Sequence, residues 1–259
     1  MNDPLAVIAQ FPGVAEAVDE ARQAVDRLYR HRVLRRASPA VSTESSLRGA
    51  RASAALEGVD VPLDSLRRDE VHDPVVQGAL RASAELGRMG PTWRKAPRQV
   101  LARLHAVAAA GLAPEDALGR PRATEEAPDP LGLGPAPSAA DASVRIESLF
   151  SLLEQPTKAP ALVLASVVHA ELVVLRPFGT ADGVVARSAA RLTLVEYGLD
   201  PKSLVVVEAG HLELPYGEAL RAYLSGSPEG VAQWVQHCAS AVVLGVRETT
   251  AICEAMQRG

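Results

Sequence analysis

The sequence is poor in cysteine and in aromatic residues. It has 2 cysteines in 259 residues, and Phe, Trp and Tyr together contribute 3%. Cys238 and Cys253 form neither a metal-binding motif nor a disulfide framework, so we expect no metal site. Aliphatic residues must therefore form the core, and a chain of this length can bury a substantial one.

Long apolar runs and an excess of positive charge are also missing. The longest apolar run, residues 159–175, is interrupted by His169 and Glu171 and is too short to span a membrane. A net charge of −4 gives no general attraction for nucleic acid or for an anionic membrane. Residues 1–10 show no basic segment followed by an apolar region, which a secretory signal would need. We expect a cytoplasmic protein that binds neither membrane nor nucleic acid.

The common nucleotide-binding motifs do not occur. Neither G-x-G-x-x-G nor a Walker loop is present, which argues against a dinucleotide enzyme and a P-loop ATPase. Apolar residues make up 47% of the chain and recur at helical rather than alternating spacing. The sequence therefore predicts an all-α fold, with an N-terminal helix in residues 1–41 and a helical domain in residues 42–259. The helix predicted for residues 42–58 starts with Ser42 or Thr43 as its cap.

The most informative stretch, residues 167–199, predicts two helices joined by a tight loop. Its apolar first half ends at Arg176, before a proline that cannot continue a helix, and a new helical pattern starts near Val184. Gly179 and Gly183 in the loop tolerate positive φ angles. The first N–H groups of the second helix point into such a joint, and the helix dipole adds partial positive charge there. The joint is therefore a candidate anion-binding site.

These residues resemble the core motif of the Fic (filamentation induced by cAMP) family, H-P-F-x-[DE]-G-N-G-R-x-x-R. Residues 176–187 of this chain read R-P-F-G-T-A-D-G-V-V-A-R. The matching positions are Pro177, Phe178, Gly183 and Arg187. Residues 169–172 are similar to the run that precedes the motif in many members. The resemblance implies a Fic-like helical bundle whose core motif occupies residues 169–191.

The chain departs from this motif at the positions that carry the family's chemistry. Arg176 stands in place of the catalytic histidine, a general base, and arginine cannot accept a proton at neutral pH. Thr180 replaces the acid that holds Mg²⁺, and Asp182 replaces the asparagine, although sliding the match by two residues lets Asp182 and Gly183 serve as the acid and its glycine. We therefore name no catalytic residue. The residues that remain for an anion or a nucleotide are Arg176, Thr180, Asp182, Gly183 and Arg187.

A second Fic-like pattern lies in the helix predicted for residues 42–58, which ends at Gly58. Ser53 and Glu57 match the pattern [ST]-x-x-x-E-[GN], which resembles the inhibitory motif of Fic proteins that carry an N-terminal inhibitory helix. In those proteins the Glu pairs with the second Arg of the core motif and blocks the pocket for the ATP γ-phosphate. The resemblance therefore implies that Glu57 contacts Arg187.

Residues 113–141 form the least helical part of the chain. They contain 6 prolines and 3 glycines, a composition that predicts a long loop. The Fic family has a flap at this place, often a small β-hairpin beside the active site, so a small β flap is the alternative. Residues 118–120 lie where members have a G-x-[FWY]-R run, but the aromatic residue is missing here.

Three functions are compatible with these patterns. The first is a divergent Fic-fold protein that has lost its catalytic histidine and metal acid and is not an AMP transferase. Such a protein needs no cofactor and acts as a binding or scaffold module for a protein partner, with a vestigial anion site. The second is an adenylyl- or phosphoryl-type transferase with rearranged chemistry, which binds ATP and Mg²⁺ and is autoinhibited by Glu57. The third is an unrelated helical enzyme that shares the loop spacing. Resemblance alone suggests a homodimer.

Overall fold

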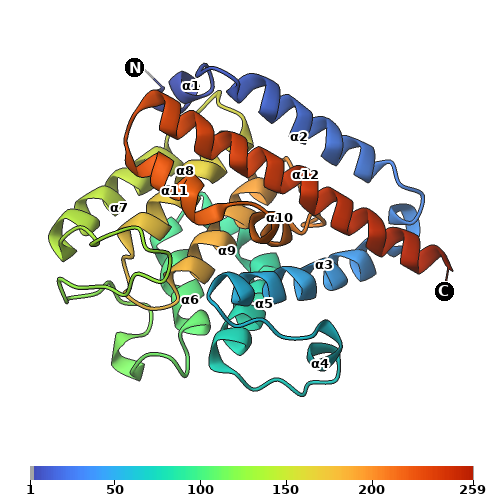
Figure 1. The fold of residues 1–259 in the computed structure, drawn as a ribbon, viewed down its shortest axis with the longest axis horizontal. Helices are drawn as coiled ribbons and strands as arrows, with labels where there is room; N and C mark the ends of the chain where they lie inside the picture. The colour runs from blue at the N-terminus through green and yellow to red at the C-terminus, as the bar shows by residue number, and fades with distance from the viewer. Residues whose placement is uncertain (1–2, 259) are drawn as a thin grey trace.

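The computed structural model describes residues 3–258, and helices make up most of this part of the chain (Figure 1). The α-helices are α1 (Pro4–Ile8), α2 (Val14–Tyr29), α3 (Leu34–Leu56), α4 (Leu63–Arg67), α5 (Pro74–Trp93), α6 (Pro97–Ala108), α7 (Ala139–Glu154), α8 (Ala161–Leu175), α9 (Asp182–Glu196), α10 (Val207–Glu213), α11 (Tyr216–Leu224) and α12 (Pro228–Arg258). A 3₁₀ turn, η1 (Glu115–Ala117), is the remaining element, and residues 3–258 contain no strand. The predicted all-α class is confirmed.

The centre of the molecule is the pair α8 and α9, which pack against each other on either side of the predicted joint (Figure 1). α8 is buried along nearly its whole length, as expected for a helix that is apolar on all sides. α7, α11 and α12 pack on α8, whereas α3, α5 and α6 pack on α9. Despite the apolar character of α8, none of the helices within residues 3–258 is both long and apolar enough to cross a membrane.

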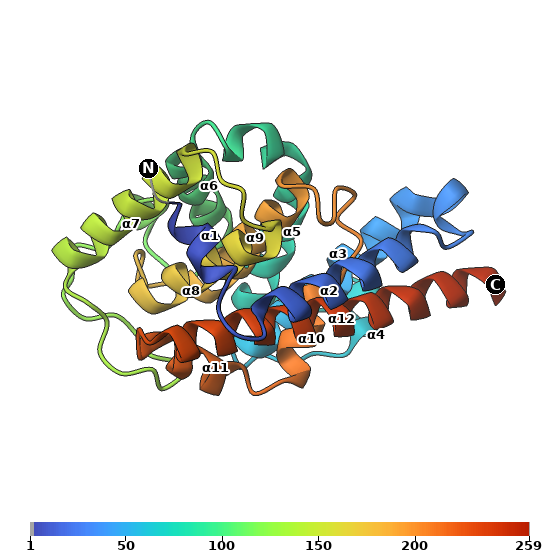
Figure 2. The same ribbon diagram turned by 90° about the horizontal axis from the view of Figure 1, so that it is seen from above.

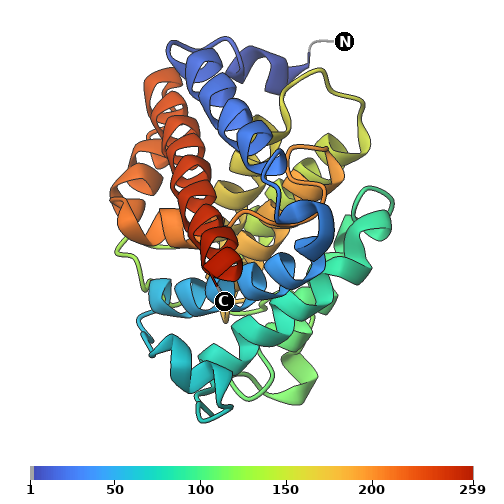
Figure 3. The ribbon, with the colours of Figure 1, turned by 90° about the vertical axis from the view of Figure 1, so that its right-hand side faces the viewer.

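The longest helix, α12, lies beside α2 along one face of the molecule (Figures 1 and 3). Seen from above in Figure 2, its C-terminal half extends beyond the central pair α8 and α9, next to α2 and the start of α3. Its buried residues include Trp234, Val235, Cys238, Val242 and Val246. These residues recur at helical spacing and form one apolar stripe along the helix.

α3 differs from its prediction at its start and agrees with it at its end. The helix begins at Leu34, with one non-helical residue, Ala37, so the predicted cap at Ser42 or Thr43 is wrong. The Ser42 hydroxyl donates instead to the Lys202 carbonyl at 3.2 Å, because α3 packs beside the segment that follows α9. The predicted stop at Gly58 is confirmed: this glycine has a φ of 92° directly after the last turn.

The segment between α6 and α7 is a long loop, as its prolines and glycines predict. It holds only the turn η1 and an isolated bridge between Ala110 and Ala113 within the described residues, so the alternative of a small β flap is wrong. Repeated prolines remove the N–H donors that a hairpin ladder needs. α7 follows from Ala139, where the Ser138 hydroxyl caps the helix. The sequence patterns did not predict α10, a helix of 7 residues.

Candidate functional site

The joint between α8 and α9 is built from three residues in the left-handed conformation. Their φ angles are 46° at Arg176, 74° at Gly179 and 53° at Ala181. A residue other than glycine pays roughly 1–2 kcal/mol to adopt this conformation. Ala181 stands where the Fic motif has a glycine. The backbone at this position therefore has a conformation that glycine adopts without strain and alanine does not. The predicted sharp joint is confirmed.

Arg176 turns its side chain to the long loop and is only 5% exposed. Its Nη2 donates to the Gly134 carbonyl at 2.6 Å, and its Nη1 donates to the Pro128 carbonyl at 3.2 Å. Nη1 also lies 3.3 Å from Asp129 Oδ1, whereas Nε is buried without a hydrogen-bond partner among residues 3–258. The guanidinium at the family's histidine position therefore fixes residues 128–134 over the joint.

A second arginine, Arg122, completes this attachment, and no sequence pattern pointed to it. Its Nε donates to the Arg176 carbonyl at 2.9 Å, and its backbone N–H donates to the Pro177 carbonyl at 2.8 Å. Its Nη2 donates to the Pro137 carbonyl at 2.5 Å. A single arginine in a proline-rich loop belongs to no repeating sequence pattern, so the sequence does not indicate that it links the loop to the joint.

Phe178, the aromatic residue of the motif, packs on His105 of α6. The two rings are stacked with centroids 4.2 Å apart and an interplanar angle of 6°. His105 is fully buried, and its Nδ1 accepts the Gly119 N–H at 2.9 Å. Burial lowers the pKa of His105 to about 4, so the ring is neutral at pH 7. His105 is therefore a packed core residue.

Asp182, the first residue of α9, directs its carboxyl group back into the joint. Its Oδ1 accepts the Phe178 N–H at 2.9 Å, and the residue is 9% exposed. Burial raises the pKa of Asp182 to about 7, against the lowering effect of the N–H groups of Phe178 and Gly179. The Asp182 carboxyl group thus accepts a hydrogen bond from the backbone of the joint and stabilises its conformation.

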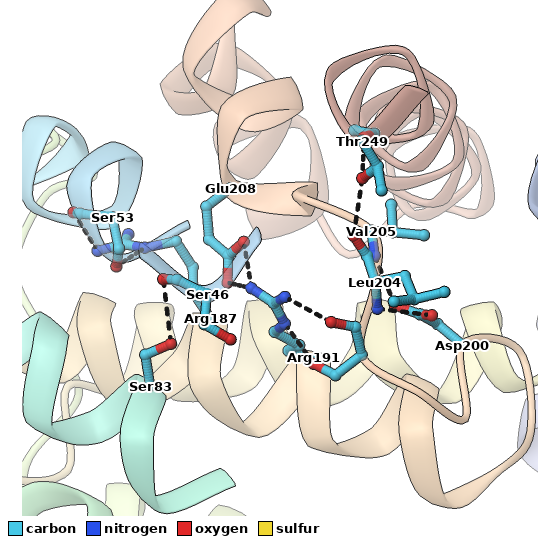
Figure 4. A network of polar contacts seen from close by, with 12 residues as sticks. Ser46, Ser53, Ser83, Arg187, Arg191, Asp200, Leu204, Val205, Glu208 and Thr249 are labelled. Carbon is cyan, nitrogen blue, oxygen red and sulfur yellow. Dashed lines mark hydrogen bonds and ion pairs between the residues drawn. The ribbon is translucent and has the colours of Figure 1, made fainter. Parts of the chain in front are cut away.

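Arg187 contacts the two residues that the second pattern singled out, Ser53 and Glu57. Figure 4 shows Arg187 beside Ser53. Its Nη2 lies 2.5 Å from Glu57 Oε1, so the predicted contact between Glu57 and Arg187 is present. Its Nε donates to the Ser53 hydroxyl at 2.8 Å and its Nη2 to the Ser53 carbonyl at 3.0 Å. The Arg187 side chain is 2% exposed and that of Glu57 is 17% exposed, so the carboxylate is the accessible partner.

A cavity of about 250 Å³ lies beside the joint, between α9 and the long loop. Its charged lining residues are Glu57, Asp129, Arg176 and Asp182. Thr180 and Gly183 also line it, but Arg187 does not, because Glu57 lies between its guanidinium and the cavity. A Cβ atom at Gly183 would lie 2.0 Å from Glu57 Oε1, so the carboxylate rests against the first turn of α9.

The residues at the joint do not fit the Mg²⁺ ion that the Fic motif implies. Mg²⁺ prefers carboxylate and water oxygens, and Thr180 offers only a hydroxyl at the position of the family's acid. Asp182 is the nearest substitute in sequence, but its Oδ1 already accepts the Phe178 N–H. The joint therefore lacks the set of acidic ligands that a magnesium ion requires.

Comparisons with known proteins identify the fold. No family model and no curated protein matches the sequence. A Fic family protein from Desulfovibrio desulfuricans G20 is similar in structure, with a TM-score of 0.76 and 20% identity over 93% of this chain and 75% of its own. For a fragment of Fic-1 from C. elegans the TM-score is 0.71 and the identity 15%, over 94% of this chain and 73% of the fragment. For a substituted form of that fragment the TM-score is 0.63 and the identity 17%, over 91% of this chain and 71% of the fragment. Residues 3–258 therefore have the fold of Fic proteins.

Proposed function

We propose that this protein is a divergent Fic-fold binding module rather than an AMP transferase. The observation that carries the proposal is the use of Arg176, which stands at the family's histidine position and holds the long loop through Pro128, Asp129 and Gly134. A guanidinium cannot act as a general base at neutral pH. Here it is also engaged with the loop, so neither its chemistry nor its placement supports deprotonation of a target hydroxyl.

The cavity supports the same proposal. Ligand pockets for molecules of drug size occupy about 300–1,000 Å³, and the cavity of about 250 Å³ falls below that range. The carboxyl groups of Glu57, Asp129 and Asp182 surround it, against the one guanidinium of Arg176. In this state Arg176 and Arg187 are already paired with Asp129 and Glu57, so neither guanidinium of the site is left for an added phosphate, as expected of a vestigial anion site whose anion is Glu57. We propose that the protein acts through a protein partner, which can be a second copy of this chain.

One observation favours the second candidate, a nucleotide-binding transferase with rearranged chemistry. Glu57 lies just after the end of α3, is 17% exposed at its side chain and contacts a deeply buried arginine. A phosphate could replace this carboxylate on Arg187 if the end of α3 moved. Under this candidate Glu57 is an autoinhibitory residue, and Asp182 is the acid available for the reaction.

Titration with ATP separates the two candidates. Calorimetry on wild-type protein and on Glu57→Ala, each with and without Mg²⁺, measures whether removal of the carboxylate opens a nucleotide site. The matched control is Glu44→Ala, because Glu44 is a similarly buried, ion-paired glutamate of the same helix and does not line the cavity. The binding module predicts no heat of binding in any of the three proteins. Binding by Glu57→Ala alone would support the second candidate, and AMP transfer by wild-type protein that is lost in Asp182→Ala would overturn the first.

A further inference from the structure

A buried cluster of imidazole, phenol and thiol groups is formed by residues of four helices. Its members come from α8, α10, α11 and α12. They are His169, His211, Tyr216, His237 and Cys238, and all are less than 9% exposed. Neither the candidate binding site nor the core requires three histidines here, since aliphatic residues would fill the same space without polar atoms to satisfy.

Three of these residues bring soft or borderline ligand atoms together. One ring nitrogen each of His169 and His211 and the sulfur of Cys238 all lie within 4.8 Å of one another. Burial lowers the pKa of both histidines well below the usual value, so their rings are neutral and keep a lone pair. A neutral imidazole is the form that binds a metal ion.

Each of the two histidines also has one ring nitrogen with a polar partner outside this set of three. His169 Nε2 lies 2.7 Å from the Tyr216 hydroxyl, and His211 Nδ1 lies 3.0 Å from His237 Nε2. Histidines that ligate a metal almost always engage their second nitrogen in this way, because the contact fixes the ring and its tautomer. The outer contacts leave Nδ1 of His169 and Nε2 of His211 for a cation.

The charges around the cluster select the kind of cation. Arg187 Nη1 approaches the Tyr216 hydroxyl at 3.5 Å, and its charge is already balanced by Glu57. A divalent ion with one thiolate would leave an uncompensated positive charge in a dry interior beside this arginine, which is costly. A monovalent ion with one thiolate is neutral, and thiolate with imidazole suits Cu⁺.

We propose that His169, His211 and Cys238 form a three-coordinate site for a monovalent soft cation, Cu⁺, which goes beyond the binding function of the joint. Burial raises the pKa of Cys238 to about 12, so the free site holds a thiol. Uptake forms a Cu–S bond and breaks the S–H bond, and the proton leaves to solvent with no change in oxidation state. Because the site is closed, the ion enters during folding or a transient opening.

The test uses the whole chain, refolded without oxygen in the presence of Cu⁺ and then titrated with a chromophoric Cu⁺ chelator. We expect one bound ion per chain, quenching of Trp234, whose ring centroid lies 5.1 Å from that of His169, and proton release on binding. Cys238→Ser should weaken binding by more than about 100-fold and Tyr216→Phe by about 10-fold. Cys253→Ser is the matched control, because Cys253 is the other buried free cysteine of the described residues, and it should bind as wild type does.

X-ray absorption on the copper-loaded wild-type protein keeps the test independent of whether a variant folds. The proposal predicts one sulfur and two nitrogen neighbours around copper. It is overturned if the spectrum shows two sulfur neighbours or only oxygen, or if folded Cys238→Ser retains wild-type affinity. Tighter binding of Zn²⁺ than of Cu⁺ at the same residues would overturn the charge argument, and no binding of either ion would leave the cluster a packed core only.

Discussion

Arg187 and Arg191 lie one turn apart on α9 (Figure 4). Each arginine is buried and paired with a glutamate, and the two ion pairs differ in their surroundings. Arg191 Nη1 lies 3.2 Å from Glu208 Oε2, and its Nε donates to the Ser203 hydroxyl at 2.8 Å. The Glu208 side chain is 8% exposed and belongs to α10, which is packed between α3 and α12. Glu57, in contrast, is 17% exposed and lines a cavity.

The comparison shows why the same pair of groups can be structural in one place and functional in another. Both arginines are too deeply buried to remain unpaired. At Arg191 the carboxylate comes from a helix that has no room to move. At Arg187 it comes from the residue directly after a helix end, next to a cavity, where another anion could take its place. The candidate site is therefore distinguished by a carboxylate that another anion could replace, and not by the ion pair itself.

The largest effect is expected from Glu208→Gln. Removal of this charge leaves Arg191 buried and unpaired, which should lower the free energy of unfolding by about 3–5 kcal/mol. Urea unfolding of the variant and of wild type measures the difference. A loss similar to that of the corresponding change at Glu57 would contradict the distinction between the two pairs.

A smaller effect is expected from alanine at the two glycines that contact these pairs. A Cβ at Gly49 would lie 2.6 Å from Arg191 Nη1 and 2.8 Å from Glu208 Oε2, and both side chains are buried, so neither can shift into solvent. Gly49→Ala should therefore cost about 1–3 kcal/mol. A Cβ at Gly183 would lie 2.0 Å from Glu57 Oε1 and 3.1 Å from Arg187 Nη1, so the Glu57 carboxylate must swing towards solvent and weaken its pair with Arg187. Because alanine also favours the helix by up to about 1 kcal/mol, Gly183→Ala should stay within about 1 kcal/mol of wild type.

The same denaturation experiment compares the two alanine variants directly. Equal losses at Gly49 and Gly183 would mean that Glu57 is as firmly held as Glu208. A Gly183→Ala protein that keeps its stability but gains ATP binding would show that displacement of Glu57 is enough to open the site.

The fold was predictable from the sequence where the apolar spacing is regular. Residues 167–199 contain an apolar helix, a proline, a glycine-containing loop and a second helix in the order that the motif requires, and the structure has α8, the joint and α9 there. The start of α3 was not predictable, because Pro39 lies inside the helix and reads as a break. α10 was missed because 7 residues are too few to show a helical period.

The candidate site was predictable only in part. The contact between Glu57 and Arg187 was expected from resemblance, since each belongs to a short pattern in its own helix. The attachment of Arg176 to residues 128–134 could not be foreseen, because backbone carbonyls of a loop accept these hydrogen bonds and any sequence supplies carbonyls. The histidine cluster was hidden for another reason: His169, His211 and His237 come from three different helices and share no spacing.

Glu57→Gln should have a smaller effect than Glu208→Gln, although the chemical change is the same. Both arginines keep hydrogen bonds to a serine, Arg187 to Ser53 and Arg191 to Ser203, and the Gln oxygen can still accept in both variants. The difference is that Glu57 lines the cavity, from which water can enter and solvate the Arg187 guanidinium. We expect a loss of about 1–2 kcal/mol in the free energy of unfolding. Urea unfolding of both Gln variants at one pH makes the comparison. A loss at Glu57 that equals the loss at Glu208 would show that the carboxylate is not replaceable.

Asp182, which lines the cavity, should make the stability of the protein depend on pH. A comparison of wild type with Asp182→Asn isolates this contribution. Burial raises the pKa of Asp182 from 3.8 to about 7, so the folded protein keeps a proton that the unfolded chain loses. Its contribution is therefore fully present below pH 4 and is lost as the pH rises to 7. Relative to Asp182→Asn, wild type should lose up to about 4 kcal/mol across this range, because a rise in pKa from 3.8 to about 7 corresponds to about 1.4 kcal/mol per pKa unit. Buried histidines act in the opposite direction below pH 6.5, but they are present in both proteins and cancel in the difference. Parallel curves for the two proteins would mean that Asp182 is ionised in the folded state, and the carboxylate would then be free to serve the second candidate function.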